Sequence, residues 1–156
     1  MKTLKTIITA TVMLFALTST QQTQAQTKEE TLEWLQINGN NYLQNDVECN
    51  WSDGSSKYYS YIYSFTEDSI ILNHNKNKIF YKDVLFVSDI SQLDEEEITG
   101  KGYCTDYLLI YINTNSGKKA FNIKNNQKSR ENAHRALKAI MHMAKLSGAK
   151  ENKQIF

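Results

Sequence analysis

The sequence predicts an α+β domain: a short N-terminal helix, six to seven antiparallel strands in a bent sheet or small barrel, and a C-terminal amphipathic helix packed on it. Three observations lead to this class. Apolar residues recur at helical spacing near the end of the chain, they alternate with polar residues through the middle, and short polar turns separate the alternating runs. Without proline, repeats or a linker, residues 26–156 are expected to form one domain.

Residues 1–25 are expected to be a secretory signal peptide. Lys2 and Lys5 supply positive charge, residues 7–17 form an apolar run, and Thr23 and Ala25 are small residues at the positions that signal peptidase reads. The apolar run is too short to span a bilayer as a permanent helix. We therefore expect an exported protein, periplasmic or extracellular, with no stable membrane insertion.

The charge balance argues against nucleic acid as a partner. Removal of the two leader lysines leaves 16 basic residues against 17 acidic residues, a net charge of −1. A chain so close to neutrality has no general attraction to nucleic acid or to anionic lipid. No nucleic-acid partner is therefore expected.

A helix of about three turns is expected near the start of the domain. Thr27 and Glu30 fit the capping-box pattern, in which each side chain accepts from the other residue's main-chain amide. Leu32 and Leu35 give the helix a short apolar side. Gly39 is a natural place for it to end.

Alternating apolar and polar residues predict the strands. The clearest alternation covers residues 59–65, and shorter or weaker runs cover residues 43–51, 69–73, 78–81, 84–87, 105–113 and 118–124. Residues 105–113 are apolar on both faces, which indicates a strand that is covered on both sides. Residues 94–102 are acidic and end in two glycines, which indicates a mobile loop.

The last helix is expected from Ser129 to Ser147, with Ser129 as its N-cap and Gly148 just beyond its end. Its apolar side comprises Ala133, Ala136, Leu137, Ile140, Met143 and Ala144, and its polar side comprises Glu131, His134, Arg135, Lys138, His142 and Lys145. A stripe of this width is typical of a helix that covers a core.

This order of elements, with a run of strands closed by one long amphipathic helix, resembles the pleckstrin-homology-like superfold. Residues 28–35 and 132–150 also look like the ends of small exported bacterial proteins of uncharacterised function. Members of the superfold that bind inositol phosphates use a basic loop between the first two strands. The matching loop here, residues 51–57, has one lysine and one aspartate, so the resemblance does not imply phosphoinositide binding. Other members bind a peptide as an added strand beside the closing helix.

Residues with candidate chemistry are few. Cys49 and Cys104 are expected to form a disulfide in an oxidising compartment, or else to be two separately buried thiols. His134 and His142 are eight residues apart with Lys138 between them, a spacing and charge that favour a solvated basic face over a metal site. The acidic run 94–97 lacks the spacing of a calcium-binding loop.

Two further patterns leave alternatives open. Tyr58, Tyr59, Tyr61 and Tyr63 share one stretch and could line a pocket, although a core role is favoured. No serine lies in a Gly-x-Ser-x-Gly elbow, and neither cysteine has the surroundings of a known nucleophile. The first hypothesis is therefore a non-catalytic exported module that binds a protein segment or small ligand, without a cofactor or a metal. The alternative is a small envelope hydrolase with an unrecognised active site.

Overall fold

The computed structural model describes residues 26–43, 45–50, 53–72, 77–98 and 107–152. The expected signal peptide, Cys104 and the third histidine of the sequence, His74, lie outside these residues, and the side chains of Cys49, Tyr58, Tyr59 and Tyr61 are also not described. The elements are α2 (Lys28–Leu43), β1 (Asn45–Asn50), β2 (Ser56–Tyr61), β3 (Tyr63–Phe65), β4 (Ser69–Leu72), β5 (Asn77–Phe80), η1 (Tyr81–Asp83), η2 (Ile90–Gln92), β6 (Asp94–Ile98), β7 (Tyr107–Thr114), β8 (Gly117–Lys124) and α3 (Gln127–Leu146). The α+β class is confirmed. In this part of the chain, no helix has the length and apolar character needed to cross a bilayer.

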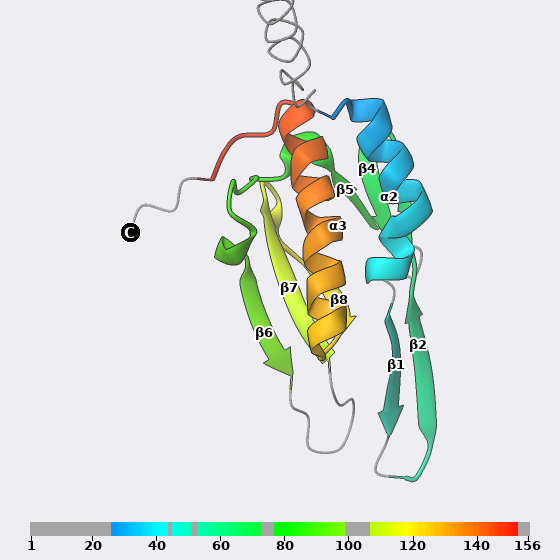
Figure 1. The fold of residues 1–156 in the computed structure, drawn as a ribbon. Helices are drawn as coiled ribbons and strands as arrows, with labels where there is room; N and C mark the ends of the chain where they lie inside the picture. Colours follow the sequence, from blue (N-terminus) through cyan, green and yellow to red (C-terminus); the bar gives the residue numbers. More distant parts are fainter. Residues whose placement is uncertain (1–25, 44, 51–52, 73–76, 99–106, 153–156) are drawn as a thin grey trace, which may run out of the picture.

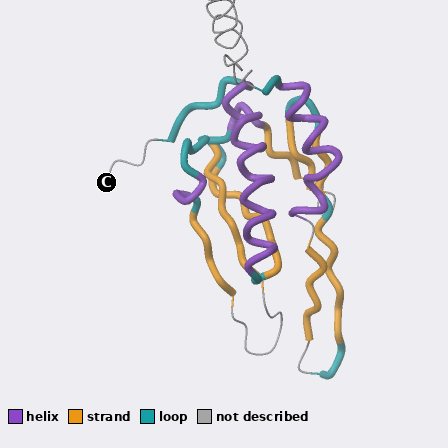
Figure 2. The backbone as a smooth tube through the Cα atoms, in the orientation of Figure 1, coloured by secondary structure: helices purple, strands orange, loops and turns teal. Residues whose placement is uncertain are grey.

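The strands form three separate antiparallel sheets rather than one bent sheet or a barrel, so that expectation is wrong. The sheets are β1–β2, β3–β4–β5 and β6–β7–β8. The run that we expected as one strand over residues 59–65 breaks at Ile62, whose side chain is 42% exposed. On one side of Ile62, β2 pairs with β1, and on the other side β3 pairs with β4. The chain therefore passes from one sheet to another inside a single alternating run (Figure 2).

Helix α2 is longer than the sequence suggested. The capping box is confirmed, because the Thr27 amide donates to Glu30 Oε2 (2.8 Å) and the Glu30 amide donates to Thr27 Oγ1 (3.1 Å). Gly39 does not end the helix but lies inside it, against the ring of Phe65. A Cβ at Gly39 would stand 2.4 Å from Phe65 Cε2. The glycine is therefore needed for the close approach of α2 to β3.

Helix α3 lies beside α2 and over the β6–β7–β8 sheet (Figure 1). Its expected apolar stripe is confirmed, since all six residues of the stripe are fully buried. The expected N-cap is wrong: the helix begins at Gln127, two residues before Ser129, and its N-cap is Asn126, whose side chain accepts from the Ser129 amide (2.9 Å). Gly148 follows the last turn with φ +80°, a conformation that ends helices and favours glycine.

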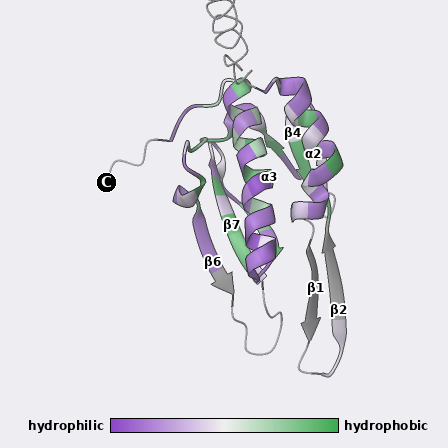
Figure 3. Ribbon diagram, in the orientation of Figure 1, coloured by the Kyte–Doolittle hydropathy of each residue, from purple (hydrophilic) through white to green (hydrophobic). Residues whose placement is uncertain are grey.

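One face of β7 lies in the core beneath α3. Leu108, Ile110 and Ile112 are at most 1% exposed. The opposite face, with Tyr107, Leu109 and Tyr111, is only half buried. The expectation that this strand is covered on both sides is therefore wrong. In Figure 3 the side of α3 that faces away from the sheet is mainly hydrophilic.

Two segments on the edge of this sheet differ from their expected structures. Residues 94–98, expected as part of a mobile loop, form β6, which pairs with β7. A charged sequence suits this position because an edge strand exposes unpaired main-chain groups, and charged side chains oppose its pairing with another chain. Residues 84–87, expected as a strand, form only two isolated bridges, between Val84 and Thr114 and between Phe86 and Glu151.

Candidate functional site

Basic side chains run along one side of α3 and face β6 and the segment before it. Their spacing of four, four, four and three residues keeps them on one side of the helix. We call this row the basic flank, and it consists of Arg130, His134, Lys138, His142 and Lys145. The sequence predicted a solvated basic face for most of these residues. In the structure the two halves of the row have different surroundings.

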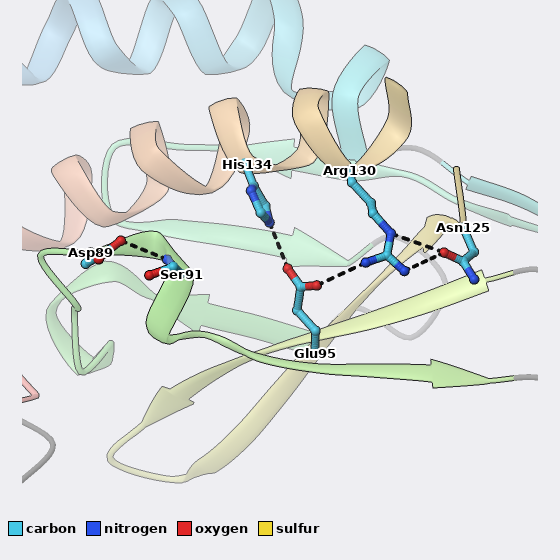
Figure 4. Close-up of polar contacts among 6 residues, drawn as sticks. All are labelled: Asp89, Ser91, Glu95, Asn125, Arg130 and His134. Atoms are coloured by element: carbon cyan, nitrogen blue, oxygen red, sulfur yellow. Dashed lines mark hydrogen bonds and ion pairs between the residues drawn. The ribbon is translucent and has the colours of Figure 1, made fainter. Parts of the chain in front are cut away.

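The N-terminal half of the flank is bound to β6 through Glu95. His134 Nε2 lies 2.8 Å from Glu95 Oε1, and Arg130 Nη1 lies 3.5 Å from Glu95 Oε2 (Figure 4). Arg130 also donates from Nε and Nη2 to Asn125 Oδ1, at 3.2 and 2.7 Å. One carboxylate thus joins two turns of α3 to the edge strand.

This cluster lacks the other parts of a hydrolytic site. A histidine oriented by a carboxylate can serve as a general base when a nucleophile or a substrate proton lies within hydrogen-bond reach. In the described part of the chain, no serine, threonine or cysteine bonds to His134. Ser91, which Figure 4 also shows, donates its amide to Asp89 Oδ1 (3.0 Å) instead. The geometry therefore favours a structural brace.

The C-terminal half of the flank borders a cleft of about 230 Å³ between α3 and residues 86–90. Eight residues line it: Phe86, Val87, Ser88, Ile90, Lys138, Met141, His142 and Lys145. Its floor is apolar and buried, because Val87, Ile90 and Met141 are at most 8% exposed. Its rim is formed by the exposed Lys138 and Lys145 and the half-buried His142.

Main-chain hydrogen bonds hold the wall opposite α3. The Phe86 amide donates to the Lys150 carbonyl (3.1 Å), and the Asn152 amide donates to the Phe86 carbonyl (2.8 Å). At the other end of the wall, the Asp89 side chain caps η2. Because both ends are fixed in this way, the cleft is a preformed feature of the fold.

The electrostatics of the cleft are one-sided. None of its eight lining residues is acidic, and among the described residues neither Lys138 nor Lys145 forms an ion pair. Hydrogen bonds from the backbone and side chain of Ser91 lower the pKa of the neighbouring Asp89, and the charge of Lys138 lowers it further. His142 Nε2 donates to the Gln26 carbonyl (2.9 Å). The two lysines are therefore the groups available to a ligand.

Two other clefts of similar size border α2 and have a different character. One, of about 240 Å³, lies between α2 and the start of α3, and its lining is mainly amide and hydroxyl side chains. The other, of about 280 Å³, lies along the outside of α2 and is lined by Lys28, Leu32, Gln36 and three glutamates. Neither combines an apolar floor with a rim of one charge.

The remaining candidate residues are not brought together. His134 and His142 have separate partners, and within the described residues no cluster of His, Cys, Asp and Glu could hold a metal ion. Strand alternation divides the acidic run, since Asp94 contacts Lys118 and Glu96 accepts from Tyr111 on the face opposite Glu95.

Tyr63, the one tyrosine of the tyrosine-rich stretch whose side chain is described, belongs to the core. Tyr63 is 1% exposed and packs against the ring of Phe121 at a centroid distance of 5.3 Å. It lines none of the three clefts. For this residue the core interpretation is therefore confirmed.

Sequence reasoning missed the two features that divide the flank. Glu95 lies in the acidic run, but nothing local indicates that it reaches α3. Of the cleft wall at residues 86–90, only residues 86 and 87 belonged to an expected strand, and the wall carries no motif. Comparison of the chain with protein-family models, with curated proteins and with solved structures finds no match.

Proposed function

We propose that this protein is a non-catalytic, exported binding module that holds a small ligand in the cleft between α3 and residues 86–90. The observation that carries the proposal is the combination of a buried apolar floor with two lysines that lack an acidic partner in the described structure. Ligand sites are typically concave and mostly apolar, with a few placed polar groups that fix orientation. This cleft has that composition.

The size of the cleft favours a small ligand over a folded partner. Its volume of about 230 Å³ lies just below the range of roughly 300–1,000 Å³ that is typical of small-molecule pockets. A group of this size is a small molecule or the end of a longer one. Among the described residues β6 pairs only with β7, and its outer edge supports a protein segment as a second kind of ligand, added as a strand.

Native mass spectrometry of the protein, gently released from its own cell envelope, tests the proposal. We expect a polypeptide mass that lacks residues 1–25 together with a reproducible added mass. Ser88→Trp should abolish the added mass, because Ser88 is exposed on the cleft wall and the indole would fill the space. Lys128→Trp, on an exposed position of α3 outside the cleft, should retain it. A bare wild-type mass, or an added mass that survives Ser88→Trp, would contradict binding in this cleft.

The alternative function, a small envelope hydrolase, rests on the His134–Glu95 pair. It requires turnover of a simple ester such as p-nitrophenyl acetate, and that turnover must depend on the imidazole. We expect no difference between the wild type and His134→Gln above the uncatalysed rate. A rate that falls by about 100-fold in His134→Gln would favour the hydrolase instead.

A further inference from the structure

We propose that the cleft selects anionic amphiphiles, that is, a single negatively charged head group joined to a short apolar chain. This inference rests on the proposed function, because it names the ligand class of the same cleft. It follows from the arrangement of the lining residues. The apolar residues form the floor and one wall, and the cationic residues form the rim on α3.

The apolar part of the ligand has a defined place. Val87, Ile90 and Met141 form an apolar floor of which a small part faces the cleft, and the half-buried Phe86 adds apolar surface beside it. Water on such a floor lacks hydrogen-bond partners, so its displacement by a hydrocarbon chain is favourable. The small volume limits that chain to a few carbons in contact.

The charged part of the ligand has a separate place at the rim. Lys138 and Lys145 lie seven residues apart, about two turns of α3, and His142 lies between them in the sequence. In the described structure these lysines lack an ion-pair partner, so both would attract an anion at the rim. Asp89, outside the lining, reduces this attraction only at the Lys138 end.

Neither part alone should bind well. An ion pair at an exposed lysine is weak in water and is screened by salt. A chain without a head group would leave the rim lysines facing an uncharged ligand. A molecule with both parts satisfies the floor and the rim together, so charge and chain length should each matter to affinity.

Four probes separate the two requirements: octanoate, octanol, octylamine and acetate, each added to the ¹⁵N-labelled protein below its aggregation concentration. We expect octanoate to shift the amides of Val87, Ser88 and Met141 with saturation. Octanol should bind about tenfold more weakly. Octylamine and acetate should not saturate.

Two sets of variants locate the charge effect. The double variant Lys138→Glu with Lys145→Glu should weaken octanoate by at least about tenfold and leave octanol unchanged. Lys128→Glu, at an exposed position in the first turn of the same helix, reverses a charge outside the cleft and should leave the affinity for both probes unchanged. Because all three positions are exposed, the variants should fold, and an unchanged melting temperature checks this.

The outcomes distinguish this inference from the proposed function. Equal affinity for octanoate and octanol, or tighter binding of octylamine, would overturn the anionic class while the cleft remained a binding site. No cleft shifts with any probe would overturn the inference, and the native mass spectra would still decide the proposed function. Loss of octanoate binding in Lys128→Glu to the same extent would also overturn it.

Discussion

The two halves of the basic flank differ in what lies opposite them. Arg130 and His134 face β6, where Glu95 binds both. Lys138 and Lys145 face residues 86–90, where the cleft has an apolar floor and no acidic residue in its lining, because Asp89 lies outside the lining and accepts from Ser91. The same row of positive charge is thus used as a brace at one end and left available at the other. A basic helical face cannot be interpreted from the helix alone, because its role is decided by the element packed against it.

Substitutions on the buried side of α3 should lower the stability far more than substitutions in either half of the basic flank. Ile140→Asp places a carboxylate at a fully buried position, and we expect a loss of at least about 3 kcal/mol in the free energy of unfolding, enough to unfold a small domain. Lys138→Asp, at an exposed position of the same helix, should change it by less than about 0.5 kcal/mol. Urea denaturation followed by circular dichroism measures both. An unchanged midpoint for Ile140→Asp would mean that α3 does not cover the core.

An acidic residue placed in the cleft should pair with the rim lysines, as Glu95 pairs with Arg130 and His134 in the other half of the basic flank. Ser88→Glu adds a carboxylate to the wall opposite the rim lysines, so octanoate affinity should fall by about tenfold, about 1.4 kcal/mol. Ser88→Gln has a similar size without the charge and should retain more of the affinity. Isothermal titration calorimetry compares the two variants. Equal losses would show that size, and not charge, excludes the ligand.

Removal of the Glu95 carboxylate should lower the stability of the fold without changing the affinity of the cleft for octanoate. Glu95→Ala leaves Arg130 and His134 without their shared carboxylate, and we expect a loss of about 1 kcal/mol because the three side chains are about a third exposed and partly screened by water. The loss should shrink at high salt. Lys145→Ala should give the reverse result, with little change in stability and weaker octanoate binding. A Glu95→Ala protein with wild-type stability at low salt would contradict the brace.

The smallest expected effect concerns Asp89, at the boundary between the two halves. Its folded-state pKa is lowered by the Ser91 hydrogen bonds, so the carboxylate contributes stability above its unfolded pKa, near 3.8, and this contribution is lost as the pH falls through the folded value. Asp89→Asn should therefore lower the melting temperature slightly at neutral pH and bring it closer to the wild-type value as the pH falls from about 5 to about 2. If the melting temperatures of the two proteins differ by the same amount at every pH, the Asp89 carboxylate does not contribute to the pH dependence of stability.

Local patterns predicted the elements well where one face is buried. The stripe of α3 and the capping box of α2 are each set by neighbours in sequence, and each is confirmed. The N-terminal boundary of α3 was missed because Asn126 and Ser129 are both good caps, and only the conformation of the preceding chain selects between them. Gly39 was misread because its close partner, Phe65, is distant in sequence.

The arrangement of the sheets and the site depended on contacts that no local pattern contains. Alternation continues through Ile62, so it cannot reveal that β2 and β3 join different sheets. A run of acids such as residues 94–97 is polar on both faces and resembles a loop until β7 is placed beside it. The basic flank was visible in sequence, but the cleft required residues 86–90 from another part of the chain.

The most direct test of the difference between the two halves is the map of octanoate-induced amide shifts along α3. Shifts that concentrate at residues 138–145 and at residues 86–90, and that are absent at residues 130–134, are the expected result. Shifts centred on His134 and Glu95, or spread evenly along the helix, would contradict it. They would show that the positive charge of α3 attracts anions regardless of what faces it.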